Sequence, residues 1–241
     1  MFEVVGAIAG TATYAVLVGV LVGFSPAHRS AKLAAFTGAA VWGVIIVTIA
    51  ALGISAPRAA GAVPIPVVAS AVLLILLFGG WGAFPQFRSA LLSVPLPALI
   101  GVNAARLGGV FFLILTADGR LSAPFGPAAG WGDMLVGALA IPIAAVAAIG
   151  AAKKRGWVGA WNALGAIDLI DAVTLGALSS PGTPFRVFTE GPGTTAMTAL
   201  PWIMVPTMLV PLYFLIHLTV GAKLRSAARV PRPVPLARST A

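Results

Sequence analysis

The sequence predicts an all-α, polytopic membrane protein: a bundle of about seven transmembrane helices with its N-terminus outside and its C-terminus in the cytoplasm. Of the 241 residues, 59% are hydrophobic and 9% are charged, and the mean hydropathy is +1.03. An average soluble domain carries about 25% charged residues. So few charges cannot solvate the surface of a soluble protein of this size. The composition therefore argues against a soluble enzyme, a nucleic-acid-binding module and a disordered chain.

Seven apolar stretches have the length of about 20 residues that a membrane-spanning helix requires. They are 4–24, 33–54, 66–84, 96–116, 133–152, 157–178 and 198–222. The first stretch is too long for a signal-peptide core, and Glu3 stands where a signal peptide carries basic residues. Pro95 and Pro97 blur the start of the fourth stretch. Short loops predict a single domain over residues 1–224, followed by a basic, Pro-rich cytoplasmic tail at 225–241 that we expect to be flexible.

The basic residues are distributed unequally between the two sides that seven spans define. One side carries most of the fifteen Lys and Arg residues: Arg29, Lys32, Arg88, Lys153, Lys154, Arg155, Lys223, Arg225, Arg229, Arg232 and Arg238. The other side carries only Arg58, Arg120 and Arg186. Because positive residues collect on the cytoplasmic side, this pattern gives the predicted orientation. It also indicates a multi-pass protein of the cell membrane, either the plasma membrane or a bacterial inner membrane.

The net charge of +9 is interpreted as this topology signal plus the basic tail, so no nucleic-acid partner is expected. The expected partners are membrane lipids, and other proteins or copies of this chain within the membrane. The absence of Cys excludes disulfides, iron–sulfur clusters and thiolate metal sites. His28 and His217 are far apart in the sequence, which argues against a multi-His metal site or a bis-His haem. No catalytic residue is predicted, and the sequence leaves the cofactor unknown.

Ionisable side chains inside spans are costly and mark functional or interhelical sites. Arg106 lies about ten residues into the fourth stretch, and Asp168 about eleven into the sixth, with Asp171 one turn beyond. Both stretches run in the same direction, so these residues lie at similar depth. Asn103 and Asn162 extend the two polar stripes at helical spacing. We therefore expect Arg106 to meet Asp168 or Asp171 in a buried polar layer.

Three roles are open for this layer. An ion pair between Arg106 and one Asp would lock two helices together, with the asparagines as interhelical hydrogen-bonding groups. Alternatively, the second carboxylate would take up and release a proton or cation, as carboxylate relays in transporters do. In a third role, Arg106 would hold a substrate anion. One arginine neutralises only one carboxylate, which favours the relay.

Two further polar residues are weaker candidates for the site. Asp133 stands at the start of the fifth stretch, where its carboxylate is expected to cap a helix N-terminus. The prolines and glycines of the preceding segment, 117–133, argue against a regular helix there. His217 is expected to be an interfacial polar residue beside Tyr213, near the cytoplasmic end of the seventh stretch. Pro201, Pro206 and Pro211 are expected to bend that stretch.

Three classes of function remain: a small-solute or proton-coupled transporter, an accessory subunit of a larger membrane complex, and a membrane-embedded enzyme acting on a lipid. A microbial rhodopsin is excluded because all four lysines fall at span boundaries. A transporter should have a polar cavity that reaches Asp168 and Asp171 from one face. A subunit should be packed solid there. We favour the transporter and keep the subunit as the alternative.

Overall fold

The computed structural model describes residues 1–56, 63–149 and 155–228, and within these ranges it contains helices and loops but no strand. Seven helices are long and apolar enough to cross a membrane: Phe2–Gly23, Arg29–Ala51, Ile65–Ala83, Leu96–Ala117, Phe125–Ala148, Arg155–Leu178 and Val205–Ser226. The predicted all-helical fold with seven spans is confirmed. The chain therefore fits a multi-pass membrane protein.

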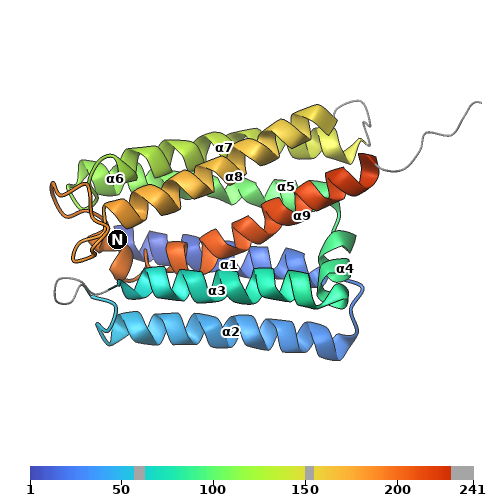
Figure 1. Ribbon diagram of the computed structural model, residues 1–241, viewed down its shortest axis with the longest axis horizontal. Helices are drawn as coiled ribbons and strands as arrows, with labels where there is room; N and C mark the ends of the chain where they lie inside the picture. The colour runs from blue at the N-terminus through green and yellow to red at the C-terminus, as the bar shows by residue number, and fades with distance from the viewer. Residues whose placement is uncertain (57–62, 150–154, 229–241) are drawn as a thin grey trace, which may run out of the picture.

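The spans form one elongated bundle (Figure 1). On one side lie α1 (Phe2–Gly23), α2 (Arg29–Ala51) and α3 (Ile65–Ala83), and on the other α7 (Phe125–Ala148) and α8 (Arg155–Leu178). The N-terminus lies at the same end as the loops before α7 and after α8, whereas the last helix, α9 (Val210–Ala228), ends at the opposite end.

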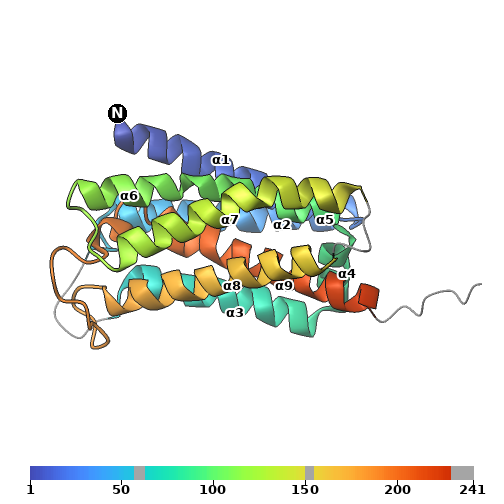
Figure 2. The same cartoon turned by 90° about the horizontal axis from the view of Figure 1, so that it is seen from above.

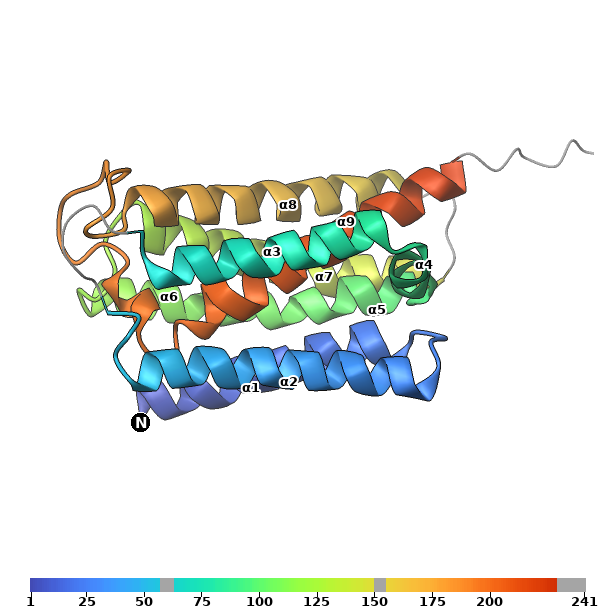
Figure 3. The same cartoon turned by 60° about the horizontal axis from the view of Figure 1, so that its bottom comes forward.

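A short helix, α4 (Pro85–Ser93), lies at the end of the bundle where α9 finishes, as Figure 3 shows. The predicted spans 66–84 and 96–116 leave this segment as a connecting loop, so its helix is not predicted from the sequence. Pro85 occupies the first helical position, where its missing N–H would have no intrahelical partner. The Lys223 ammonium donates a hydrogen bond to the Leu92 carbonyl oxygen, which ties α9 to this helix.

The fourth span has the predicted limits, but its centre is not α-helical. It consists of α5 (Leu96–Gly101), the 3-10 segment η1 (Val102–Gly109) and α6 (Val110–Ala117). A 3-10 run of this length is uncommon and marks strain or function. The backbones of η1 and α7 are close together here: a Cβ on Gly137 would stand 2.7 Å from the Leu107 backbone nitrogen. A Cβ on Gly109 would stand 2.6 Å from the Gly130 carbonyl oxygen. Glycines are therefore what permits this contact.

The fifth span begins two turns earlier than predicted. Helix α7 starts at Phe125, with Pro124 at the N-cap position, so the expectation that this segment is irregular up to Asp133 is wrong. Pro127 falls in the first turn, where backbone N–H groups have no intrahelical acceptor and proline is therefore tolerated. Pro142 lies inside the same helix.

The seventh span begins later than predicted. Residues 199–203 form bends and turns, and the π-helical turn η4 (Val205–Leu209) leads directly into α9. Pro206 and Pro211 lack the N–H that an α-helix needs, and a π turn accommodates missing bonds of this kind. Helix α9 continues to Ala228, past the predicted start of the tail at residue 225. The rest of the predicted tail, 229–241, lies outside the described residues.

The seventh span is the most deeply buried of the seven candidates. It crosses the middle of the bundle, between α1 and α3 when seen from above (Figure 2). The main apolar core surrounds it, with side chains that are at most 1% exposed on four elements: Leu17, Leu99, Ile100, Val136, Leu215 and Ile216. This span is therefore the axis on which the other helices pack.

We expect Gly137→Ala to destabilise the protein, because the added methyl group would force η1 and α7 apart. Overpacking of this kind costs about 1–3 kcal/mol, which lowers Tm by about 2–4 °C per kcal/mol. The measurement is thermal unfolding of the purified protein in mild detergent.

The matched control is Gly159→Ala on α8, where a Cβ meets nothing within 4 Å. Because alanine is the better helix former, Tm should stay the same or rise. Equal Tm values for the two variants would show that η1 and α7 are not in close contact.

Candidate functional site

The side chain of Arg106 lies in the centre of the bundle, on the 3-10 segment η1, and is 1% exposed. Its Nε donates to Asp133 Oδ1 on α7 over 2.7 Å, and its Nη2 donates to Asp168 Oδ2 on α8. Its Nη1 lies 3.5 Å from the Gly165 carbonyl oxygen. One guanidinium thus connects three of the seven spans.

His217 joins this cluster from α9. Its Nε2 lies 3.3 Å from Arg106 Nη1, and its Nδ1 lies 3.0 Å from Asn162 Oδ1. A guanidinium only donates hydrogen bonds, so Nε2 must be the acceptor. The hydrogen of the imidazole is then on Nδ1, which donates to Asn162. These five residues, Arg106, Asp133, Asn162, Asp168 and His217, are called the Arg106 cluster below. The cluster connects four of the seven spans.

Two aromatic rings enclose the cluster. The Arg106 Cζ atom lies 5.4 Å from the centre of the Tyr213 ring, within the range of a cation–π interaction. The Trp161 ring centre is 5.3 Å from that of His217, and Trp161 Nε1 donates to the Val136 carbonyl oxygen over 3.1 Å. The two rings thus pack against Arg106 and His217.

Two glycines make room for the side chains that reach Arg106. A Cβ on Gly132 would collide with the Asp168 carboxylate, and a Cβ on Gly165 would collide with the His217 ring. Both glycines lie inside helices, α7 and α8. The cluster therefore depends on small residues at these two positions as much as on the charged ones.

The cluster contains one fixed positive charge and two carboxyl groups. If both Asp133 and Asp168 were ionised, the centre of the bundle would carry a net negative charge, which is costly away from water. A single bound proton removes that excess. With one bound proton, Arg106 would still be paired with one carboxylate.

The structure brings together some of the predicted site residues and separates others. Arg106 and Asp168 form an ion pair, and Asn162 is connected to Arg106 through His217. Asn103 is fully buried, but its Nδ2 donates back to the Leu99 and Ile100 carbonyl oxygens of its own span. Asp171 is exposed on α8 and forms no ion pair within the described part of the chain.

Asp133 and His217 lie at other places than their sequence patterns indicate. The capping role of Asp133 is wrong, because α7 begins at Phe125 and places Asp133 two turns inside the helix. His217 is not at a span end: it is 3% exposed and lies near the middle of the span Val205–Ser226. The Asp133 error arose because the prolines before it were interpreted as a loop, although α7 already begins at Phe125. The His217 error arose because the predicted stretch, 198–222, begins and ends earlier than the span Val205–Ser226. The only sequence signal for Tyr213 in this site is its spacing of one turn from His217.

A cavity of about 290 Å³ extends from the Arg106 cluster toward the end of the bundle that holds the N-terminus. Its walls come from α1, α3, η1, α6, α7, α8 and the segment 194–213, and they are mostly apolar. Arg106, Asp133 and Tyr213 line its deep end. The expectation of a polar cavity that reaches Asp168 and Asp171 is wrong: neither residue lines the cavity, which is mostly apolar and reaches Asp133 instead. Among the described residues, no three His, Asp or Glu side chains are arranged to hold a metal ion.

We expect Arg106→Ala to destabilise the protein more than Asp168→Asn does. Removing the fully buried guanidinium leaves two partly buried carboxyl groups without their cation. Breaking a buried pair in this way costs about 3–5 kcal/mol. The measurements are the yield of monodisperse protein in mild detergent and its Tm. The control is Asp171→Asn, which should resemble the wild type. Normal accumulation and an unchanged Tm for Arg106→Ala would contradict a structural role of the ion pairs.

Comparison with known proteins places the chain in a family. No curated protein and no solved structure matches it significantly. A family model described as "Domain of unknown function (DUF8737)" matches residues 62–225. The matched part excludes α1 and α2 and includes every residue of the Arg106 cluster. Since this region is more than half of the chain, the protein belongs to the DUF8737 family.

Proposed function

We propose that this chain is a carrier of the cell membrane that moves a small solute and couples its movement to a proton. The observation that carries the proposal is the cavity, whose deep end is lined by Arg106 and Asp133. A concave, mostly apolar pocket with a few convergent polar groups is the usual form of a small-molecule site. Here the polar groups include the carboxyl group of Asp133, which shares Arg106 with the carboxyl group of Asp168.

The coupling acts through Asp133. When Asp133 is ionised, its charge-assisted bond to Arg106 Nε holds α7 against η1. A proton on Asp133 weakens this contact, because the guanidinium then faces a neutral carboxyl group and the Coulomb attraction between the two charges is lost. Arg106 keeps Asp168 as its partner, so the cluster does not lose its ion pair. Protonation thus changes the contact between η1 and α7 at the place where the cavity ends.

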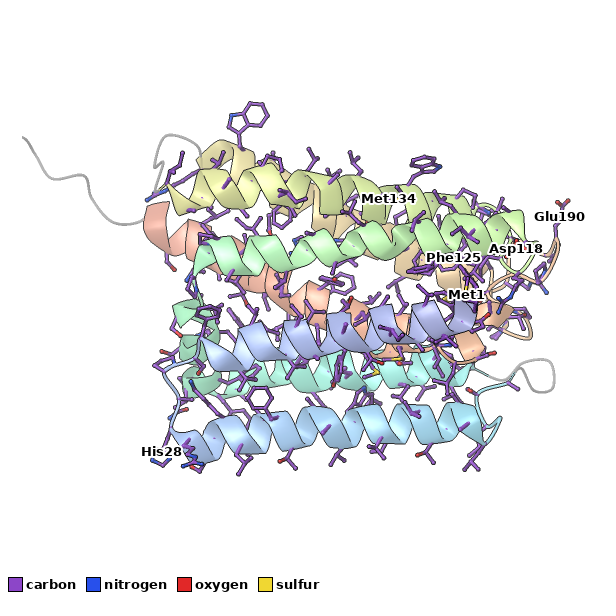
Figure 4. The ribbon with its side chains drawn as sticks, turned by 180° about the vertical axis from the view of Figure 1, so that it is seen from behind. Met1, His28, Asp118, Phe125, Met134 and Glu190 are labelled. Atoms are coloured by element: carbon purple, nitrogen blue, oxygen red, sulfur yellow. The ribbon has the colours of Figure 1, made fainter. Side chains whose placement is uncertain are left out.

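The proposed orientation has the N-terminus outside and the C-terminus in the cytoplasm, as the positive-inside pattern indicates. Met1, Asp118 and Glu190 lie at one end of the bundle and His28 at the other (Figure 4). Arg29 and Lys32 follow His28 directly. In this orientation the cavity lies in the outer half of the membrane, and the partners are membrane lipids.

An accessory subunit of a larger membrane complex is the second candidate, and one observation favours it. Helix α2 buries only Ile46 in the described structure, and most of its other side chains are exposed. Such a helix has room for a protein partner on its outer face. In this case the Arg106 cluster acts only as a lock between helices.

Single-cysteine labelling tests the orientation, because the natural chain contains no Cys. Thr189→Cys lies in the loop after α8, and Ser30→Cys lies near the start of α2, at the opposite end of the bundle. We expect a membrane-impermeant maleimide to label Thr189→Cys in intact cells, and Ser30→Cys only after the membrane is opened. The reverse pattern would overturn the orientation.

Proton coupling is testable in proteoliposomes that contain the purified protein and a trapped pH-sensitive dye. We expect members of a panel of small neutral solutes to change the luminal pH in wild-type vesicles but not in protein-free ones. Asp133→Asn should reduce this signal at least about tenfold, because a loss of 1.4 kcal/mol in coupling already gives that factor.

Asp171→Asn is the matched control and should keep the signal, because Asp171 lies outside the Arg106 cluster. Tm values of both variants establish that they are folded. If Asp133→Asn is as active as the wild type, or if no solute of the panel moves protons, the carrier mechanism is wrong.

A further inference from the structure

The π turn η4 and the start of α9 contain a carbonyl group whose usual hydrogen-bond donor is missing. In a regular α-helix, the carbonyl oxygen of Thr207 would accept a hydrogen bond from the N–H of residue 211. Residue 211 is proline, which has no N–H. Thr207 is fully buried, and a buried carbonyl group without a donor costs free energy. This oxygen therefore needs a donor from elsewhere in the fold.

The donor comes from α2, which lies at one edge of the bundle (Figure 1). Trp42 Nε1 donates to the Thr207 carbonyl oxygen over 3.0 Å. An indole N–H can only donate, so the two groups are complementary. Helix α2 buries only Ile46 in the described structure. The Trp42 hydrogen bond is thus a specific contact between a peripheral helix and a point where the backbone bonding of the seventh span is interrupted.

The neighbours of Trp42 on α2 pack against the same turn. Ile46 belongs to one apolar cluster with Met204 and Met208, and Trp42 packs against that cluster. A Cβ on Gly43 would stand 3.3 Å from Met208 Cε, which shows how closely the two segments approach. Positions 42, 43 and 46 lie on one face of a helix. That face of α2 therefore contacts η4.

The π turn sets the position of the side chains that α9 brings to Arg106. Pro206 and Leu209 of the turn line the cavity. Tyr213 and His217 follow Leu209 at intervals of four residues, which is about one helical turn each. The Tyr213 ring centre lies 5.4 Å from Arg106 Cζ, and His217 Nε2 lies 3.3 Å from Nη1. A change in the turn would shift both side chains relative to the guanidinium.

We propose that Trp42 is a positioning residue, which supplies the hydrogen-bond donor that Pro211 withholds from Thr207. It fixes the π turn and, through α9, the two side chains that contact Arg106. Trp42 lies outside the part of the chain that matches the family model, whereas Thr207 and Pro211 lie inside it. This inference rests on the proposed carrier function only for its effect on transport, because the hydrogen bond acts on the turn whether or not a solute moves.

The test is a double-mutant cycle, measured by hydrogen–deuterium exchange of the purified full chain in mild detergent. Trp42→Phe keeps an aromatic ring and removes the N–H. We expect it to lower the amide protection of the segment 203–215 by roughly two- to tenfold, the effect of one hydrogen bond on a local opening equilibrium. Pro211→Ala supplies a backbone N–H for Thr207. On that background Trp42→Phe should lower the protection by less than about twofold, because the two substitutions are coupled.

Trp161→Phe is the matched control, because Trp161 Nε1 also donates to a backbone carbonyl oxygen, that of Val136, over 3.1 Å. The α-helical donor for Val136 is the N–H of residue 140, which is alanine. Trp161→Phe therefore removes the same kind of bond from a carbonyl group that has a backbone donor. Its effect on the protection of α7 should be the same with and without Pro211→Ala.

Unchanged protection of the segment 203–215 in Trp42→Phe would overturn the inference. A loss confined to α2 would overturn it as well, since that is the result expected of a packing contact alone. An undiminished effect of Trp42→Phe on the Pro211→Ala background would have the same meaning. If Pro211→Ala does not fold, the comparison of Trp42→Phe with the wild type over 203–215 and α2 decides.

Transport gives a separate measurement. In the proteoliposome assay, Trp42→Phe should reduce the solute-driven pH signal by a factor similar to its effect on protection. Coupling between the Trp42 and Pro211 substitutions without any solute-driven proton movement would support this inference and contradict the carrier. Proton movement without such coupling would contradict this inference and support the carrier.

Discussion

A guanidinium buried inside an apolar bundle has to be surrounded by acceptors, because an unpaired charge away from water is among the most costly features a fold can contain. Arg106 meets this requirement with carboxylates from α7 and α8, the Gly165 carbonyl oxygen, and the imidazole of His217 from α9. The guanidinium donates in fixed directions within a plane. Each partner helix therefore has its depth and rotation set by this one side chain.

The backbone around Arg106 departs from regular α-helix, and small residues replace larger ones where its partners approach. The fourth span changes to a 3-10 segment around Arg106, and Gly137 lets α7 approach it closely. Gly132 and Gly165 leave the space that Asp168 and His217 occupy. The same close packing leaves a cavity on the other side of η1, between α1, α3 and α8. The polar cluster and the apolar cavity thus meet at the wall that Arg106 and Asp133 share.

Seven spans could be predicted because apolar stretches of sufficient length are a property of the sequence alone. The depth of Arg106 relative to Asp168 was also predictable, since both positions follow from a constant rise per residue along neighbouring helices. Asp133 could not be identified as a partner, because its depth depends on where α7 starts. Local signals favoured a loop at Pro124 and Pro127, but proline is compatible with the first turn of a helix.

The sequence by itself determined that the chain is a multi-pass helical protein, how many spans it has, and which few charged residues lie deep among apolar ones. These features can be predicted from composition and length, because the bilayer requires every span to be apolar and long enough, whatever its neighbours are. Which carboxylate Arg106 uses, that His217 reaches it, and that Asp171 does not join it depended on packing between helices. Which side chains meet depends on how each helix is rotated about its own axis. That rotation is set by contacts between residues that are far apart in the chain.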